Sequence, residues 1–534
     1  MNFENKFLKE QIITYLGNKR KLLVFLDETI DELIQNDKDL VKKDKVSFLD
    51  AFSGSGIVSR YAKLKGLVPY TNDLESYSYI INQAMIGTNP EDVQEIFDIV
   101  ERNIGLESST KSYFNVLKYL NSLEKPVEES SLYFSKHYAP KDTSSPDFNN
   151  ERLFYTQENG LKIDAIQEVI QNKDLFTEKA KNIILASLCH HLTTNINTSG
   201  TMKGFHNGWG GKGKNSLNRI MAPIILKEIP FIKGDRGVHF NNYAEKLFTK
   251  EELHEIDIIY ADPPYNQHQY SANYNHLTTL VKNDKYEPGE VIKGSRAGIR
   301  TDHNRSNFCK SVKDKEKNRL VDNAFREFIS EMKGKYIIMS YNNEGLVKID
   351  DLVRILSEDL NNKISIKYKM HDKYKGGKNT NVSNKVLEYL IIIEKGRKQD
   401  ESSFNKMIDN ILKLTKKEEM EDMYIDYDKI VDNIYFKVTK GQNHVKISRL
   451  TDIDDRALVL IDLSSYKVLS SDEVNMTEKE KTNVLEYSCD KLCLIKKYIY
   501  DKNKKEAEKI LNSFKIKKYD EEYTYFSNEI DKLE

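Results

Sequence analysis

The amino-acid sequence predicts an α/β protein with an open sheet, and three stretches carry this prediction. Residues 46–58 have the pattern of an apolar strand that runs through a Gly-x-Gly turn into a helix. Residues 67–75 have the pattern of a second strand that ends in acidic residues, and residues 256–265 that of a buried strand that ends in Asp-Pro-Pro-Tyr. Ligands of open α/β sheets bind at the carboxyl ends of strands, where all three stretches place polar residues.

Length and composition bound the class of protein. The chain has 534 residues, which predicts two or three domains, and its 39% hydrophobic and 31% charged residues are typical of a globular protein. No apolar run reaches the roughly 18–20 residues that a membrane span requires, and the first residues lack the apolar core of a signal peptide. Four cysteines fit a reducing compartment, so we expect a cytoplasmic protein with no membrane segment and no metal site.

The charge is balanced overall but uneven along the chain. A net charge of −1 argues against a globally basic nucleic-acid binder. Residues 199–219 nevertheless carry four Lys or Arg and no acid, and residues 293–319 carry nine Lys or Arg against three acids. A single run of this kind is usually solvated surface. Two of them near a candidate ligand loop predict a local phosphate footprint.

The first two elements predict a nucleoside site. Residues 15–19, Tyr-Leu-Gly-Asn-Lys, form a turn that leads into a predicted helix over 21–35, which alone is a common helix start. The glycines Gly54 and Gly56 permit a tight turn and a close approach to a ligand, but the third glycine of a dinucleotide fingerprint is missing. Asp73 follows about 20 residues later, with Glu75 behind it, where an acidic residue binds ribose hydroxyls. A nucleoside without a pyrophosphate fits this pattern.

The Asp-Pro-Pro-Tyr loop can hold a planar base that carries an exocyclic amine. Asp262 can accept one amino N–H, the Pro263 carbonyl can accept the second, and the Tyr265 ring can stack on the base. Two acceptors would orient the nitrogen lone pair toward an electrophile, and such positioning supplies much of a rate enhancement. The plain alternative is a strand that ends at two prolines and is followed by a buried tyrosine.

Taken in order, YLGNK, LDAFSGSG, NDLE and ADPPY resemble the N6-adenine DNA methyltransferases of the group that contains the Dam methylases. The run DPPYNQHQYSANYNHL, with SYNNEGL at 340–346, looks closer still to modification methylases of FokI-like type IIS restriction systems. The resemblance covers roughly residues 6–396. It implies a Rossmann-like methyltransferase sheet, S-adenosyl-L-methionine as methyl donor and adenine N6 in double-stranded DNA as acceptor. The target base would be flipped out of the duplex, because a stacked base cannot reach the cofactor. A cognate restriction endonuclease is a further implied partner.

The resemblance also implies the site residues. The cofactor residues would be Tyr15, Gly17 and Lys19 in the first element, Asp50, Phe52, Gly54 and Gly56 in the glycine turn, Asp73 at the ribose position, and Asn242. Asn242 stands where relatives often carry an acid that contacts the cofactor adenine. The catalytic loop would be Asp262, Pro263, Pro264 and Tyr265. An Asp at the first loop position favours adenine. Methylation of cytosine N4 or of RNA, and a catalytically silent DNA-binding subunit, stay open as alternatives.

The same resemblance divides residues 1–396, and it does not extend to residues 397–534. Residues 1–88 and 236–396 would form the catalytic domain, residues 89–235 an inserted, mostly helical target-recognition domain, and residues 397–534 an α+β accessory domain of unknown role. The last predicted helix of the insertion covers 216–229, and residues 266–319 are expected to form a flexible lid. The DNA contacts expected from the two basic stretches are Lys203, Lys212, Lys214, Arg219, Lys293, Arg296 and Arg300.

Overall fold

The computed structural model describes residues 2–211, 216–249, 253, 256–294, 296–298, 300–302, 304–310, 319–359, 361–372, 385–421, 424–431, 435–440, 443–448, 504–512, 527–528 and 530–532. The chain divides into two compact units. The first unit comprises Met1–Lys369 and Glu388–Gln399, and the second comprises Met370–Leu387 and Asp400–Glu534. Among the described residues, no helix combines the length and the apolar character needed to cross a membrane.

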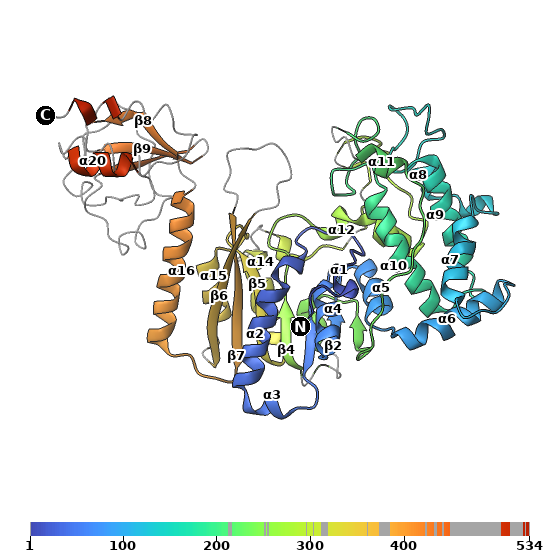
Figure 1. The fold of residues 1–534 in the computed structure, drawn as a ribbon, viewed down its shortest axis with the longest axis horizontal. Helices are drawn as coiled ribbons and strands as arrows, with labels where there is room; N and C mark the ends of the chain where they lie inside the picture. The colour runs from blue at the N-terminus through green and yellow to red at the C-terminus, as the bar shows by residue number, and fades with distance from the viewer. Residues whose placement is uncertain are drawn as a thin grey trace. The chain divides into compact units, whose positions relative to one another are not determined.

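A seven-stranded sheet forms the centre of the first unit (Figure 1). In spatial order its strands are β3 (Val238–Phe240), β2 (Val68–Asn72), β1 (Ser47–Asp50), β4 (Ile256–Ala261), β5 (Gly334–Asn342), β7 (Lys385–Lys395) and β6 (Asn362–Asp372). β1 pairs in parallel with β2 and β4, and β4 pairs in parallel with β5. β7 runs antiparallel to β5. This arrangement confirms the predicted Rossmann-like sheet.

The strand order reverses beside β1. The chain passes from β1 to β2 and β3 on one side, and to β4 and β5 on the other. In open α/β sheets the crevice at such a reversal is the usual ligand site. All six residues of β4 are buried, as expected for a central strand covered on both faces.

The helices linked to the sheet bury their apolar stripes against it. Phe48 of β1 and Ile258 of β4 share a core with Ile30 of α2 and Tyr61 of α4. These helices and their neighbours are α1 (Lys6–Lys9), η1 (Lys19–Leu22), α2 (Leu23–Asn36), α3 (Lys38–Lys42), α4 (Ile57–Lys65), α5 (Ser76–Met85), η3 (Ala244–Thr249), α12 (Tyr270–Asn273), α13 (Asn275–Lys282), η5 (Asn307–Cys309), α14 (Leu320–Glu331) and α15 (Ile349–Leu356).

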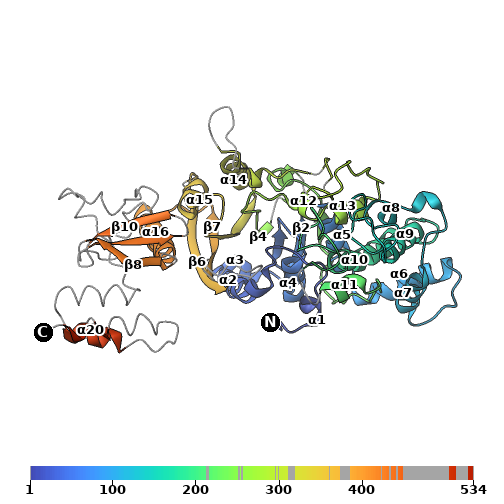
Figure 2. The same ribbon diagram turned by 90° about the horizontal axis from the view of Figure 1, so that it is seen from above.

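A helical region lies beside the β3 edge of the sheet (Figures 1 and 2). It contains α6 (Pro90–Asn103), α7 (Ser112–Ser122), η2 (Glu129–Ser131), α8 (Phe134–His137), α9 (Gln157–Ile170), α10 (Glu178–Thr194) and α11 (Ser216–Met221). One apolar core runs through these helices and on into α5 and α13. The helical region is therefore packed against α5 and α13 through a shared core.

The helix predicted over 216–229 is wrong beyond Met221. Pro223 follows the end of α11, and a proline clashes with a helix that continues through it. The backbone beyond it is held by side chains instead. Asn159 Oδ1 accepts the Ile224 N–H at 3.0 Å, and Asn121 Oδ1 accepts the Leu226 N–H at 2.8 Å.

The second unit has a helix and a small antiparallel sheet. It contains α16 (Glu401–Glu421), β8 (Tyr424–Val431), β9 (Tyr435–Lys440), β10 (Asn443–Ser448) and α20 (Lys504–Leu511). β9 lies between β8 and β10 and pairs antiparallel with both. This helix and these strands agree with the α+β character predicted for the region, whereas residues 449–503 lie outside the described residues.

Candidate active site

A pocket lies where β1, β2 and β4 end. Its lining brings together three segments that are distant in sequence: the first loop, the glycine turn and the Asp-Pro-Pro-Tyr loop. The predicted residues in this lining are Tyr15, Gly17, Lys19, Asp50, Phe52, Gly54, Asp73, Asn242, Asp262, Pro263, Pro264 and Tyr265. Gly56 stands behind the lining, at the N-cap of α4.

The glycine turn needs its glycines. Gly54 and Gly56 have φ values of 50° and 73°, a region that other residues enter at a cost. A Cβ on Gly54 would lie 2.8 Å from Cε1 of Tyr15, and one on Gly56 would lie 2.9 Å from Oδ1 of Asn82. The turn can therefore pass directly beneath the Tyr15 ring, which joins the first loop to the glycine turn.

The two acids after β2 have different environments. Asp73 Oδ2 accepts the Gly54 N–H at 2.6 Å, and Asp73 Oδ1 accepts the Glu75 N–H at 2.8 Å. Asp73 thus fixes the glycine turn through Oδ2 and the backbone of its own loop through Oδ1. Glu75 lines the same pocket and is 5% exposed. Burial, reinforced by the charge of Asp73, raises the pKa of Glu75 well above its usual value.

Asp50 lines this pocket, and one of its carboxylate oxygens has no hydrogen-bond donor among the described residues. Its Oδ2 accepts the Ser59 hydroxyl at 2.6 Å, while its buried Oδ1 meets no hydrogen-bond donor among the described residues. Burial raises the pKa of Asp50 to about 7. A buried acceptor without a donor is costly, so the position suits a ligand that brings a cationic or N–H donor.

Asn242 lines the pocket, but its side-chain oxygen is used locally. Asn242 Oδ1 accepts the Tyr243 N–H at 2.9 Å, and its backbone bonds twice to the Asn72 amide. Glu245, three residues on, was not predicted as a site residue, yet it lines the pocket and is buried. Its position at the start of η3, close to the expected acid, is the signal that could have identified it.

Asp262 ends β4 beside a buried ammonium. Lys19 Nζ lies 3.2 Å from Asp262 Oδ1 and 3.5 Å from Glu388 Oε2, and 5.4 Å above the centre of the Tyr265 ring. Burial raises the pKa of Asp262 to about 6, and Lys19 opposes that rise. Burial disfavours the Lys19 ammonium, but Asp262 and Glu388 outweigh it and raise the pKa of Lys19. Glu388, on β7, was not predicted as a site residue.

Three tyrosines tie the segment that follows the catalytic loop to the first loop. The Tyr15 ring stacks on Tyr274 at 4.8 Å between centroids and lies 5.2 Å from Tyr270. The Leu16 N–H donates to the Tyr274 hydroxyl at 2.7 Å, and the Tyr270 hydroxyl donates to the Leu16 carbonyl at 3.3 Å. The prediction of a flexible lid is therefore wrong for this part, because α12 anchors it to the first loop.

Arg300 is a correction to the predicted DNA contacts. Its guanidinium is 2% exposed, and its five N–H donors bond to Asp284, Asp302 and Thr279. No donor is left for a phosphate, so Arg300 fixes the loop in place.

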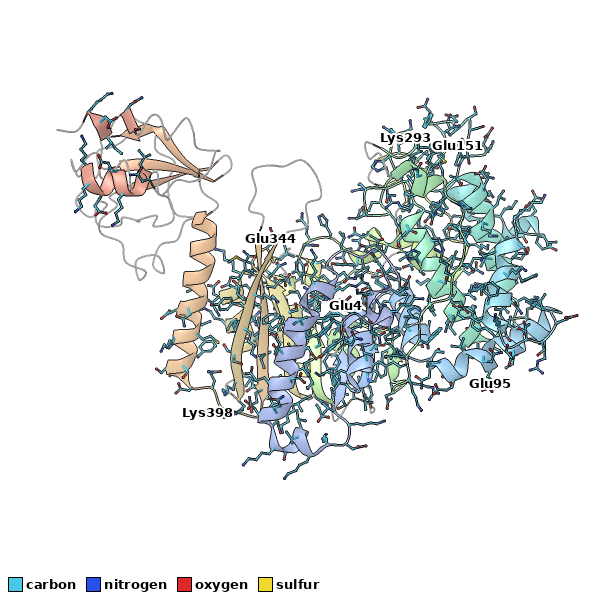
Figure 3. The ribbon with its side chains drawn as sticks, viewed as in Figure 1. Glu4, Glu95, Glu151, Lys293, Glu344 and Lys398 are labelled. Carbon is cyan, nitrogen blue, oxygen red and sulfur yellow. The ribbon has the colours of Figure 1, made fainter. Side chains whose placement is uncertain are left out.

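The other predicted contacts are placed unevenly. Arg219, Lys293 and Arg296 are exposed, whereas Lys203 is half-buried. Lys293 lies beside the segment that carries Glu151, where its Nζ donates to Asn149 Oδ1 at 2.7 Å (Figure 3). Lys212 and Lys214 lie outside the described residues.

The fold and pocket define a class: a nucleoside-binding, Rossmann-like transferase with an Asp-Pro-Pro-Tyr loop beside the cofactor crevice. The family model of the D12 class N6 adenine-specific DNA methyltransferases matches residues 15–338. The chain belongs to this family.

Its relatives include bacterial modification enzymes. The chain is 27% identical over 401 residues to the modification methylase StsI of Streptococcus sanguinis, covering 74% of this chain and 54% of that protein. It is 29% identical over 392 residues to the type II methyltransferase M.NlaIII of Neisseria lactamica, covering 72% of this chain and 99% of that protein. It is 28% identical over 392 residues to M.FokI of Planomicrobium okeanokoites, covering 71% and 52%. The chain thus spans about half the length of StsI and M.FokI.

Proposed function

We propose that this protein transfers a methyl group from S-adenosyl-L-methionine to N6 of adenine in double-stranded DNA, at a specific sequence. The observation that carries the proposal is the position of Asp262. It directly follows β4, pairs with Lys19 at 3.2 Å and lines the same pocket as the glycine turn. An amine held there would lie beside a nucleoside cofactor.

The residues of the pocket fit the cofactor. When bound, S-adenosyl-L-methionine supplies a methyl group on a positively charged sulfur. The unsatisfied Asp50 Oδ1 would accept the ammonium of its methionine part, and the buried Glu75 would accept its ribose hydroxyls. Gly54 lets the backbone approach the cofactor closely. Asp73 would support this site indirectly, through the Gly54 N–H.

Glu75→Ala should weaken cofactor binding by about tenfold, the usual worth of a buried hydrogen bond. Its melting temperature should stay close to that of the unmodified protein. Asp73→Ala is the matched variant: it should lower both affinity and melting temperature, because the Gly54 N–H loses its acceptor. Calorimetric titration with S-adenosyl-L-methionine measures the affinities. Unchanged affinity in Glu75→Ala would rule out this assignment.

The proposed chemistry needs Asp262 as an acceptor. Its carboxylate and the Pro263 carbonyl would take the two amino hydrogens of the target base, which points the nitrogen lone pair at the methyl group. The Tyr265 ring would stack on the flipped base. The nitrogen forms the new bond to carbon as the sulfur–carbon bond breaks, and a proton then leaves the nitrogen.

The rate of methyl transfer should therefore depend on pH through Asp262. Its pKa is about 6, so the carboxylate is ionised above that pH and becomes a protonated, poorer acceptor below it. We expect the single-turnover rate to be level above pH 7 and to fall about tenfold per unit below pH 6. A rapid-quench pH series at saturating cofactor and DNA measures this. A flat profile from pH 5 to 8 contradicts it.

Adenine is favoured over cytosine N4 by the Asp at the first loop position and by the family match, and both alternatives share the same mechanism. RNA as the acceptor is the remaining rival within the enzyme class. A catalytically silent subunit is disfavoured because the pocket retains Gly54, Asp50 and the whole Asp-Pro-Pro-Tyr loop.

We further place DNA reading in the inserted region, residues 89–235, within a catalytic domain of residues 1–88 and 236–396. The exposed Arg219, Lys293 and Arg296 are the proposed phosphate contacts. Residues 397–534 would be an accessory domain.

We also propose that the protein is the modification enzyme of a restriction-modification system with a cognate endonuclease, since its relatives include the modification methylase StsI and type II methyltransferases. Expression in a host without DNA methylation, followed by single-molecule sequencing of its genome, tests both parts. The expected result is N6-methyladenine at one short motif, at which the DNA resists one endonuclease. Modified adenine scattered without a motif would refute sequence specificity.

A further inference from the structure

Glu388 is a buried carboxylate that lies beside Lys19, although it is distant in sequence from the catalytic loop. It lies on β7, opposite Asn342 of β5, and is 5% exposed. Its Oε2 accepts a hydrogen bond from Lys19 Nζ at 3.5 Å. Glu388 is not among the residues that line the pocket, and it lies outside both the catalytic loop and the glycine turn.

Lys19 is shared between two carboxylates. The ammonium is 4% exposed, so it depends on these partners for its charge. Its Nζ lies 3.2 Å from Asp262 Oδ1 and 3.5 Å from Glu388 Oε2. Asp262 Oδ1, the oxygen that faces Lys19, is itself buried. This sharing matters because a Lys19 charge that fell on Asp262 alone would weaken that carboxylate as an acceptor for the target amine.

We infer that Glu388 is a positioning residue that shares the Lys19 ammonium with Asp262 and holds it in place, so that Asp262 keeps enough negative charge to accept the amine of the target base. The inference rests on the proposed function. Lys19 keeps one carboxylate partner when Asp262 turns to the substrate, so no buried charge is stranded during the switch.

The same grouping also has an electrostatic effect. Two carboxylates and one ammonium leave one net negative charge at the loop. The target nitrogen gains positive charge as its bond to the methyl group forms, and a fixed negative charge in a buried site stabilises that change. The other ionisable groups facing Lys19 are the hydroxyls of Tyr260 and Tyr265. They supply no negative charge near neutral pH, because burial raises the pKa of both.

The test is a double-mutant cycle between Glu388→Gln and Lys19→Met, read by single-turnover methylation of duplex DNA. Glu388→Gln keeps the shape and removes the charge. It should slow methyl transfer by about tenfold to a hundredfold, the usual worth of a hydrogen bond to a charged group. Its affinity for S-adenosyl-L-methionine and its melting temperature should stay close to those of the unmodified protein. Glu388→Asp, which keeps the charge, should recover part of the rate.

The decisive reading is the second arm of the cycle. Because Glu388 acts through Lys19, Glu388→Gln should cost less than about threefold when Lys19 is already Met. Glu101→Gln is the matched control, a buried carboxylate that accepts the Ser109 N–H at 3.0 Å in the helical region. It should change the melting temperature without changing the rate per folded enzyme.

Three results overturn the inference: an unchanged rate in Glu388→Gln, an equal loss with and without Lys19, or a loss that follows a drop in folded protein. The unmodified protein is the arm that separates the two claims. If it forms no N6-methyladenine, the proposed function fails, and the role of Glu388 falls with it. If it is active and the cycle is additive, only the role of Glu388 fails.

Discussion

Asp262→Ala should slow methyl transfer by about a hundredfold to a thousandfold, comparable to the loss of one preorganised hydrogen-bonding group in other enzymes. The carboxylate is the acceptor that orients the target amine. The other carboxylates of the pocket lining lie at or beyond the ends of β1, β2 and β3: Asp50, Asp73, Glu75 and Glu245. The fold should persist, because Lys19 keeps Glu388 as its partner. Rapid-quench assays with saturating DNA and labelled cofactor measure the rate.

The matched variant is Asp262→Asn, which keeps one acceptor oxygen and the side-chain shape. It should retain more activity than Asp262→Ala. Calorimetric titration checks that both variants still bind the cofactor within a few fold of the unmodified protein. Turnover by Asp262→Ala at the unmodified rate would mean that the catalytic site lies elsewhere.

Tyr265→Ala should reduce methyl transfer by about tenfold to a hundredfold, because stacking of a base on an aromatic ring contributes about 1–3 kcal/mol. Tyr265 lines the pocket next to Asp262 and makes a T-shaped contact with the Tyr341 ring, with 6.2 Å between the ring centres. Tyr265→Phe keeps the ring and should retain most of the activity. An equal loss in Tyr265→Phe would show that the hydroxyl, not the stacking face, is what matters.

A probe for the flipped base gives a second readout for Tyr265. Duplex DNA with 2-aminopurine at the target adenine should fluoresce when the unmodified protein flips the base. The Tyr265→Ala variant should alter that signal while the DNA stays bound. Unchanged fluorescence together with a lowered rate would place Tyr265 in the chemistry rather than in holding the base.

Local patterns predicted most of the catalytic half. The strands around Phe48 and Ile258 could be predicted because a buried strand needs a short apolar run. Gly54 and Asp262 could be singled out because turns and prolines end such runs. The helix over 216–229 failed at Pro223, a local signal that the apolar spacing obscured.

Pairings made by the tertiary fold were out of reach. Glu388 is 126 residues from Asp262 in the sequence. Only the pairing of β7 with β5 brings it to Lys19. Arg300 lies in a basic stretch that resembles a phosphate site, and the sequence does not show that Asp284 and Asp302 enclose it. The different roles of Asp73 and Glu75 likewise depend on the backbone N–H groups of Gly54 and Glu75, both of which donate to the Asp73 side chain.

The decisive measurement is methyl transfer by the purified protein from labelled S-adenosyl-L-methionine into unmethylated duplex DNA. The DNA is then digested to nucleosides, with Asp262→Ala run in parallel. We expect label in N6-methyladenine alone, formed about a hundredfold to a thousandfold more slowly by the variant. Label in N4-methylcytosine, or equal label from Asp262→Ala, would contradict this expectation.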